Sequence, residues 1–455
     1  MLFEIAALLS TSVGSATEAF SLPSPAYSVV STSVNGGNYS LTSPIRLGTP
    51  QASVPGPFIG PDPGASVQLR GTRLLQELTL LSAPQVTEFL HANPAAVDSL
   101  LAQPPAAQEV TMWWGAMGDE HRDAVMAASP QLVGNLEGIP YQFRDEANRA
   151  FLTATINDLN AVIAQPDTGR TVVDLAQRQL VMLDSISTAL NVEDTAAPRT
   201  LLSLDVTGQG RAAIILGDLR EADYVTYLVP GMFFTIENQM SDWSKAASDL
   251  YTEQLQWLDR LGERDSSVAT IAWIGYPTPN LTNVGGIGNA EIGRDTLARS
   301  IEGLQALRSA DEPYVSVIAH SYGSTAALLA LAEYDFQIDA LALVGSPGSP
   351  ARSVDELNVR DKNVWVGEAP WDPIPNSAYF GSDPGAASYG AKSMSVSGGT
   401  DPITHTALLG STGHNEYFTA GTESMRNFAL ISIGRGDLVT GNSTPAVVSA
   451  SGARK

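Results

Sequence analysis

Cysteine is absent from this chain of 455 residues. Its absence excludes a disulfide framework, a zinc site built on thiolates and a cysteine nucleophile. Histidine is scarce, and its five residues form neither an H-E-x-x-H motif nor a close pair, so we expect no histidine-based metal site. Counting residues leaves a carboxylate site for a hard cation open. We predict that the protein uses neither a metal nor a cofactor.

Positive charge and long apolar runs are also in short supply. The formal net charge is −23 and the pI is near 4.5, which disfavours binding to nucleic acid and to anionic lipid. The apolar N-terminal run contains Glu4 and follows no Lys or Arg, so a Sec signal peptide is not expected. No segment approaches the roughly 18 uncharged apolar residues that span a bilayer. We expect a soluble protein, cytoplasmic or exported without a Sec signal.

Composition and hydrophobic periodicity divide the chain into four parts. Residues 1–70, rich in Ser, Pro, Gly and Thr, are interpreted as an extended arm. Residues 71–197 have apolar residues at helical spacing and are predicted to form an all-helical module, with one continuous helical segment over 109–128. Residues 198–436 are predicted to form an α/β domain, and residues 437–455 a disordered tail.

The α/β domain begins with a predicted β-hairpin at 201–217, where two apolar runs flank a Gly-Gln-Gly turn. Short β-rich runs then alternate with helical segments. The runs cover residues 224–231, 268–277, 314–321, 339–348, 363–370 and 391–399, and helices are expected over 241–264, 290–310, 324–334 and within 415–434. This alternation predicts a mostly parallel sheet with flanking helices, whose active groups collect at the carboxyl ends of the strands.

The segment YVSVIAHSYGS, residues 314–324, has the pattern of a nucleophile elbow. An apolar β-branched run stops at Ser321, and a helix-forming sequence follows at once. The strained turn requires small neighbours. Gly323 meets this need, while Ala319 stands where the G-x-S-x-G pattern has its first Gly. The alternative is a buried strand-to-helix turn in an enzyme of another chemistry.

A serine hydroxyl becomes a nucleophile only with a base and a carboxylate that orients the base. In folds with a nucleophile elbow, the carboxylate follows a strand after the nucleophile, and the histidine follows the last strand. Asp372 lies just past the run 363–370 in a proline-rich loop, and His414 lies between the last predicted strand and the final helix. We therefore predict Ser321, Asp372 and His414 as the catalytic residues.

Several other residues compete for these roles. His405 also follows the last strand and is the alternative base. Asp383 and Asp401 are alternative carboxylates, but both stand in turn sequences where Asp serves as a cap or Asx turn. His320 is expected to point away from the nucleophile and to pack beside the site. The remaining histidines, in the helical module, are expected to be solvated or locally bonded.

Acyl transfer also requires N–H donors for the developing oxyanion. One is the backbone N–H of Tyr322, the residue after the nucleophile, and the other comes from the loop after the strand at 224–231. Gly231 lets this loop approach the substrate, so Met232 or Phe233 can present its N–H, and we choose Met232. Pro230-Gly231 is alternatively an ordinary turn. Apolar residues near these strand ends could line the site or belong to the core: Met232, Phe233, Phe234, Trp273 and Tyr276.

Seven short motifs together resemble the DUF1023 family of α/β-hydrolases, which is found chiefly in actinobacteria. They are VPGM, AWIGYPTP, AHSYGS, LVGSPGSP, VWVGEAPWDPI, GSDPG and GHNEYF, in order between about Thr200 and Gly434. The resemblance implies an α/β-hydrolase fold preceded by a helical extension. It also implies that Ser321, Asp372 and His414 occupy the triad positions. Ala319 departs from the family's usual Gly.

These features predict a serine hydrolase that cleaves a carboxylic ester, a lipid or small acyl ester, through an acyl-enzyme. The alternative is an interaction or type VII secretion-linked protein whose helical module binds a small helical partner. Its motivation is Trp113-Trp114-Gly115, which fits the W-x-G turn of exported helical hairpins. A third possibility is that the helices form a lid over the strand ends.

Overall fold

A computed structural model describes residues 71–192 and 197–441 of the chain. All of these residues belong to one compact unit, Pro61–Lys455. The predicted arm at 1–70 and most of the predicted tail, from residue 442 onward, lie outside the described residues.

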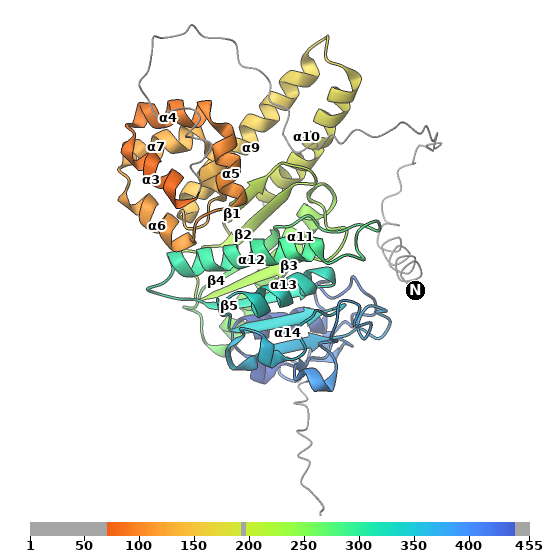
Figure 1. The fold of residues 1–455 in the computed structure, drawn as a ribbon. Helices are drawn as coiled ribbons and strands as arrows, with labels where there is room; N and C mark the ends of the chain where they lie inside the picture. The colour runs from red at the N-terminus through yellow and green to blue at the C-terminus, as the bar shows by residue number, and fades with distance from the viewer. Residues whose placement is uncertain (1–70, 193–196, 442–455) are drawn as a thin grey trace, which may run out of the picture. The chain divides into compact units, whose positions relative to one another are not determined.

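The described part of the helical module contains eight helices (Figure 1). They are α3 (Thr72–Leu80), α4 (Ala83–Ala92), α5 (Pro94–Ala102), α6 (Ala107–Ala116), α7 (Asp119–Ala128), α8 (Pro130–Asn135), α9 (Tyr141–Ala164) and α10 (Arg170–Leu190). Of these, α3 to α8 and the start of α9 enclose an apolar core of their own. The continuous segment predicted over 109–128 is wrong, because Met117 and Gly118 have extended backbones. A new helix starts at Asp119 and Glu120, whose charges suit a helix N-terminus.

Trp113 and Trp114 lie inside α6 and are buried in the module's core. The ring of Trp114 packs against Phe143 of α9, with 5.3 Å between ring centroids. The helix continues through Gly115. The prediction of a W-x-G turn at this place is therefore wrong, and the pair is an aromatic core element.

The α/β domain is built on an eight-stranded sheet in the order β1-β2-β4-β3-β5-β6-β7-β8. Its hairpin is antiparallel, β2 pairs antiparallel with β4, and every other pairing is parallel, which confirms the predicted fold class. The strands are β1 (Arg199–Asp205), β2 (Arg211–Gly217), β3 (Tyr224–Val229), β4 (Val268–Ile274), β5 (Tyr314–His320), β6 (Ala340–Val344), β7 (Val364–Gly367) and β8 (Lys392–Ser393).

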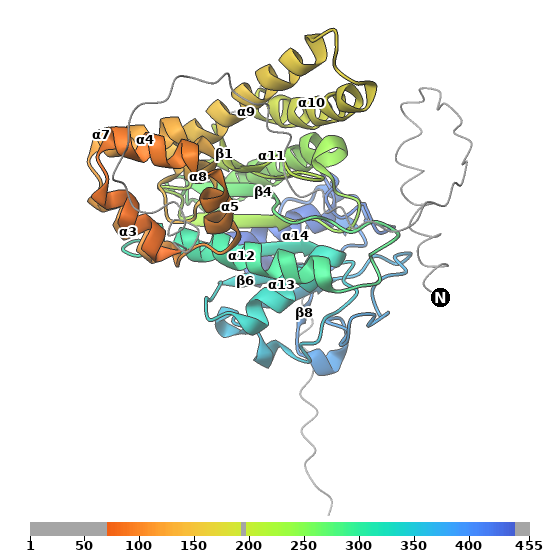
Figure 2. The ribbon, with the colours of Figure 1, turned by 45° about the horizontal axis from the view of Figure 1, so that its top comes forward.

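Helices cover both faces of this sheet (Figures 1 and 2). On one face, apolar residues of α10, α11 (Ile236–Leu261) and α14 (Glu423–Ser432) form one core cluster with the strands. On the other, α12 (Gly288–Leu307) and α13 (Tyr322–Glu333) form a second cluster. Successive residues of β2 alternate between the two, as a strand buried on both faces requires.

The last strand is shorter than predicted, and the tail begins later. Met394 still donates its N–H to Val366, but the N–H of Ser395 turns to the carbonyl of Thr440 (2.8 Å). The chain therefore leaves the sheet where the C-terminal segment meets it. Val439 is buried, and Thr440 Oγ1 donates to Glu423 (2.6 Å). Val439 and Thr440 thus pack against the domain, although the tail was predicted from residue 437.

Side chains of the helical module cap the free edge of β1. Asn135 donates to the carbonyl of Leu204 and accepts from its N–H, both at 2.9 Å. Asn148 donates to the carbonyl of Leu201 (3.0 Å), and Asp145 accepts from the Leu201 N–H (2.6 Å). These contacts replace a ninth strand on an edge that would otherwise pair with another chain. The module thus covers the sheet's outer edge through α8 and α9.

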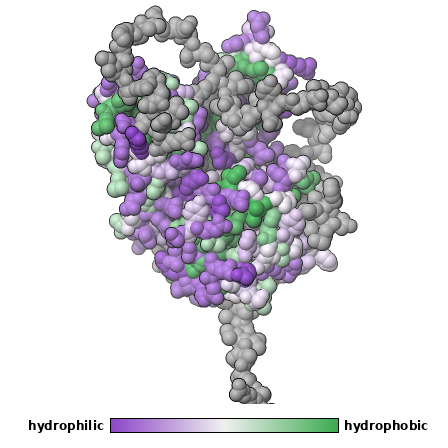
Figure 3. All heavy atoms as spheres, viewed as in Figure 1, coloured by the Kyte–Doolittle hydropathy of each residue, from purple (hydrophilic) through white to green (hydrophobic). Residues whose placement is uncertain are grey.

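No helix within residues 71–192 and 197–441 is long and apolar enough to cross a bilayer. The face drawn in Figure 3 is mostly hydrophilic, with apolar residues gathered near its middle and in smaller patches at its upper left and top. Most large apolar side chains of the α/β domain lie instead in the two clusters flanking the sheet.

Candidate active site

Ser321 lies at the junction of β5 and α13, with a φ of 52° and a ψ of −130°. A serine at positive φ is strained and persists only where its surroundings hold it. Its N–H donates to the carbonyl of Val344 (2.9 Å), and its carbonyl accepts from Ser324 Oγ (2.5 Å). A side chain at Gly323 would collide with the carbonyl of Pro230. The turn therefore has the strain and the small neighbour expected of an elbow.

Ala319 does not disturb this turn. It is a regular residue of β5, in register with Val229 of β3 and Leu343 of β6. Its methyl group is fully buried in the core cluster on the side of α12 and α13. At the first glycine position of the G-x-S-x-G pattern, this chain therefore has an alanine whose methyl group is packed in the core.

A hydrogen-bonded chain joins three predicted site residues. Ser321 Oγ lies 2.7 Å from His414 Nε2, and His414 Nδ1 lies 2.9 Å from each carboxylate oxygen of Asp372. Ser321 and His414 are only 4% and 3% exposed. With the Nδ1 proton donated to the carboxylate, Nε2 is free to accept the serine proton. The structure thus brings the three residues together in the order hydroxyl, imidazole and carboxylate.

Asp372 is held in its charged form. Burial alone would raise its pKa, but hydrogen bonds from His414, the N–H of Ile374 and the hydroxyl of Tyr417 outweigh burial and leave the pKa below its usual value. An ionised carboxylate at this point stabilises positive charge on the imidazole.

Tyr417 is part of the site and was missed by sequence reasoning. Its hydroxyl accepts from the N–H of Ala369 (2.9 Å) and donates to Asp372 Oδ2 (2.7 Å). Because the Ala369 N–H occupies a lone pair of the Tyr417 oxygen, the hydroxyl proton points to the Asp372 carboxylate. Burial, and then the charge of Asp372, raise the pKa of this phenol far above its usual range, so it remains a donor. The only signal in the sequence is its place three residues after His414, in GHNEYF.

Gly345, at the end of β6, was also missed. Its φ is +59°, and an added Cβ would lie 2.9 Å from Asp372 Oδ2 and from two atoms of the His414 ring. A larger residue would push the imidazole and the carboxylate away. A lone glycine after an apolar run gives no sequence signal for this contact.

The predicted oxyanion donors lie at the elbow and on the loop after β3. Tyr322 is the first residue of α13, where an N–H has no acceptor one turn earlier. Gly231 brings the β3 loop close, since a Cβ there would lie 2.5 Å from Ser321 Cβ and 3.1 Å from its Oγ. Phe233 cannot serve, because its N–H donates to the carbonyl of Pro279 (3.0 Å). Met232 remains the candidate on this loop.

The competing histidines lie in other surroundings. His320 is buried, and its Nε2 lies 2.7 Å from the backbone carbonyl of His414, so this ring contacts the main chain of His414. Burial, and then the neighbouring His414, lower the pKa of His320 to about 3, which keeps it neutral. His405 is exposed on a loop and His91 on α4, while His121 contacts the carbonyl of Leu81 (2.7 Å).

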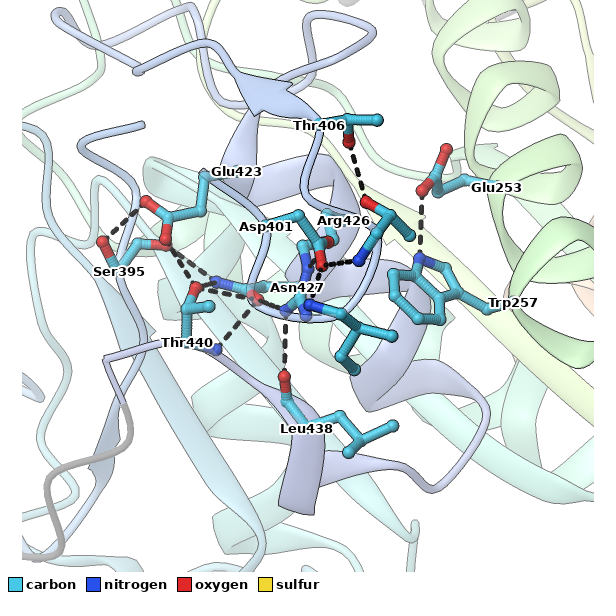
Figure 4. A network of polar contacts seen from close by, with 12 residues as sticks. Glu253, Trp257, Ser395, Asp401, Thr406, Glu423, Arg426, Asn427, Leu438 and Thr440 are labelled. Carbon is cyan, nitrogen blue, oxygen red and sulfur yellow. Dashed lines mark hydrogen bonds and ion pairs between the residues drawn. The ribbon is translucent and has the colours of Figure 1, made fainter. Parts of the chain in front are cut away.

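The competing carboxylates lie in turns, as predicted. Asp383 accepts from the N–H of Gly385 (2.8 Å). Asp401 accepts from the N–H groups of Ile403 and Thr404 and also forms a buried ion pair with Arg426 of α14. Figure 4 shows this ion pair inside a polar network that includes Glu423 and Thr440. Asp401 therefore anchors the loop before His414 to α14, a role that its turn sequence did not indicate.

Two residues proposed as apolar lining are core residues instead. Trp273 and Tyr276 are buried in the cluster with α12 and α13. Met232 is also buried, whereas Phe233 and Phe234 are partly exposed. Among the described residues, no group of three or more His, Cys, Asp or Glu side chains could hold a metal ion.

A protein-family model agrees with this architecture. A family model described as alpha/beta hydrolase matches residues 205–382, a range that includes Ser321 and Asp372. An uncharacterized protein of Mycobacterium tuberculosis is 27% identical over 402 residues, covering 78% of this chain and 59% of the relative. One from Mycobacterium bovis is 27% identical over 213 residues, covering 44% of this chain and 80% of the relative. The chain thus spans about 59% of the length of the first of these relatives.

Solved esterases are similar at lower levels. A hyperthermophilic esterase from the archaeon Pyrobaculum calidifontis has a TM-score of 0.33 and 12% identity, covering 61% of this chain and 97% of that one. Carboxyl esterase 2 of the fungus Tuber melanosporum has a TM-score of 0.31 and 11% identity, covering 54% of this chain and 89% of that one. From the sheet topology and the family match, the chain contains an α/β-hydrolase fold preceded by a helical region.

Proposed function

We propose that this protein is a serine hydrolase that cleaves a carboxylic ester, of a lipid or a small acyl group, through an acyl-enzyme on Ser321. One observation carries the proposal. The strained serine is the first member of an unbroken hydrogen-bonded chain from Ser321 Oγ through His414 to an ionised Asp372. The motif set and the hydrolase-family match support it, and we extend the assignment to the DUF1023 family on the motifs.

The proposed reaction has two steps of acyl transfer. Ser321 Oγ attacks the ester carbonyl while His414 Nε2 takes the serine proton, and Asp372 stabilises the resulting imidazolium. The N–H groups of Tyr322 and Met232 bind the oxyanion. His414 then gives its proton to the leaving alcohol. A water molecule, activated by the same imidazole, hydrolyses the acyl-enzyme and restores the serine.

An interaction function is not supported by its original motivation, because Trp113-Trp114-Gly115 lies inside α6 rather than in a turn. The relatives are described only as uncharacterized, and no described contact of this chain favours a small helical partner. We therefore propose an enzyme with a small-molecule acyl substrate.

The test is hydrolysis of p-nitrophenyl esters of increasing chain length by the full chain and paired variants. Ser321→Ala, His414→Asn and Asp372→Asn should each lower kcat by about 10³-fold or more, since the triad acts as a unit. The matched variants His405→Asn and Asp383→Asn should retain activity within about twofold, since both side chains lie outside the hydrogen-bonded chain. Activity in Ser321→Ala equal to wild type would refute the proposal.

A further inference from the structure

Three hydrogen bonds tie the loop after β3 to the segment after β4. Tyr276 Oη donates to the carbonyl of Pro230 (2.7 Å), the N–H of Phe233 donates to the carbonyl of Pro279 (3.0 Å), and Thr278 Oγ1 donates to the carbonyl of Phe234 (3.0 Å). The two segments thus meet along five consecutive residues, 230–234. The residues between the first two bonds are Gly231, which lies against Ser321, and the proposed oxyanion donor Met232.

The loop needs such support because its conformation is strained. Phe233 has a φ of 64°, which is rare and strained for a bulky side chain. A residue in this region keeps its conformation only when surrounding contacts fix it. The bonds to Phe233 N–H and Phe234 O fix both sides of the strained residue. In doing so they occupy the Phe233 N–H and leave Met232 with an N–H that has no acceptor within the described ranges.

Tyr276 is itself firmly held. Its side chain is fully buried, and its ring stacks between Trp273 and Tyr322, with centroids 6.0 and 6.5 Å apart. The backbone of Gly293 on α12 lies so close that an added Cβ would be 3.2 Å from the ring. Burial raises the pKa of this phenol well above its usual value, so the hydroxyl remains a donor. A rigid donor on a carbonyl fixes the plane of the following peptide.

We propose that the segment Tyr276–Pro279 is a template for the oxyanion loop, with Tyr276 and Thr278 as positioning residues that hold the Met232 N–H in place. This inference rests on the proposed function and assigns a role to AWIGYPTP. Neither side chain touches the reacting atoms. Each acts through a backbone carbonyl of the loop, so their loss should weaken binding of the transition state more than binding of the substrate.

The test compares Tyr276→Phe and Thr278→Val with Tyr227→Phe. Tyr227 is a matched control, because its buried hydroxyl also donates to a backbone carbonyl, that of Ser300 at 3.2 Å on α12. For each variant, kcat and KM are measured on the best p-nitrophenyl ester. The inhibition constant is measured for an alkyl boronic acid of the same chain length, whose serine adduct places an oxygen where the oxyanion forms.

Tyr276→Phe should lower kcat by about 10- to 100-fold, since a donor lost outright costs about 10²- to 10³-fold, and leave KM within about threefold. The inhibition constant of the boronic acid should rise by the same factor by which kcat falls. Thr278→Val should act in the same direction. Hydrogen exchange of residues 230–234, followed by mass spectrometry, should quicken in both variants and not in Tyr227→Phe.

Two outcomes would overturn the inference: kinetics of Tyr276→Phe and Thr278→Val that match those of Tyr227→Phe, or unchanged exchange at 230–234. Failure of the proposed function gives a different result, because the wild-type enzyme would then show no ester hydrolysis that Ser321→Ala removes. The exchange measurement reports on the template without any need for activity.

Discussion

Replacing Gly345 by alanine should displace the His414 imidazole without removing any side chain of the site. The added Cβ would lie 2.9 Å from Asp372 Oδ2 and from His414 Cε1 and Nδ1, whereas ordinary contacts begin at 3.4 Å. Restoring an ordinary contact of 3.4 Å would move the imidazole and the carboxylate by about 3.4 − 2.9 = 0.5 Å. Because a misplacement of about 1 Å can cost 10²-fold in rate, we expect kcat/KM to fall by about 10- to 100-fold.

The substitution has a second cost, which a control separates. Alanine at a φ of +59° is strained by about 1–2 kcal/mol. Gly208, in the turn between β1 and β2, has a φ of +61° and nothing within 4 Å of an added Cβ. Gly208→Ala should therefore lose a similar free energy of unfolding and keep its activity.

The assay is hydrolysis of the best p-nitrophenyl ester, with urea unfolding of both variants at the same pH. The reasoning predicts a loss of stability in both variants, at least as large in Gly345→Ala, and loss of activity in Gly345→Ala alone. Activity of Gly345→Ala close to that of Gly208→Ala would refute it, because the imidazole would then tolerate the methyl group.

Three further variants test other contacts. Tyr417→Phe removes a hydrogen-bond donor to Asp372, so the pKa of that carboxyl should rise. The acid limb of the pH profile of kcat/KM should then move to higher pH, with about a tenfold lower plateau. An acid limb at the same pH as in the wild type would contradict this prediction. His320 has a folded pKa of about 3 against 6.5 for an exposed histidine, so the unfolded chain binds the extra proton between these values and stability falls as pH drops through this window. His320→Gln should reduce the slope of unfolding free energy against pH by up to about 1.4 kcal/mol per pH unit. Urea unfolding at pH 6.5, 5.5 and 4.5 measures this slope. Equal slopes in the wild type and the variant would argue against the prediction. Ala319→Gly deletes a buried methyl group and loosens β5, so it should cost about 1–2 kcal/mol of stability and not raise kcat; a faster enzyme would mean that the methyl group distorts the elbow.

The sequence was informative where local chemistry decides the structure. Apolar runs ending in Gly, Pro or Ser predicted the parallel strands, and small residues around Ser321 predicted the strained turn. Chain order was enough to choose Asp372 and His414, because parallel strands carry their C-terminal loops to one edge.

The contacts that support these residues could not be predicted in the same way. Tyr417, Gly345 and Tyr276 contact strands and loops that are far away in the sequence. A buried tyrosine or a glycine is also common in an ordinary protein core, so the residue type alone does not mark a site. The short β8 has the same cause, because it depends on a tertiary partner, the Thr440 carbonyl that takes the Ser395 N–H.

The central claim is that Ser321 is a nucleophile activated by His414. A fluorophosphonate probe tests it most directly, since the probe is attacked only by an activated hydroxyl, and mass spectrometry locates the adduct. We predict one adduct, on the peptide containing Ser321, with none in Ser321→Ala and greatly slowed labelling in His414→Asn. Equal labelling of wild type and Ser321→Ala, or an adduct on another residue, would contradict the account.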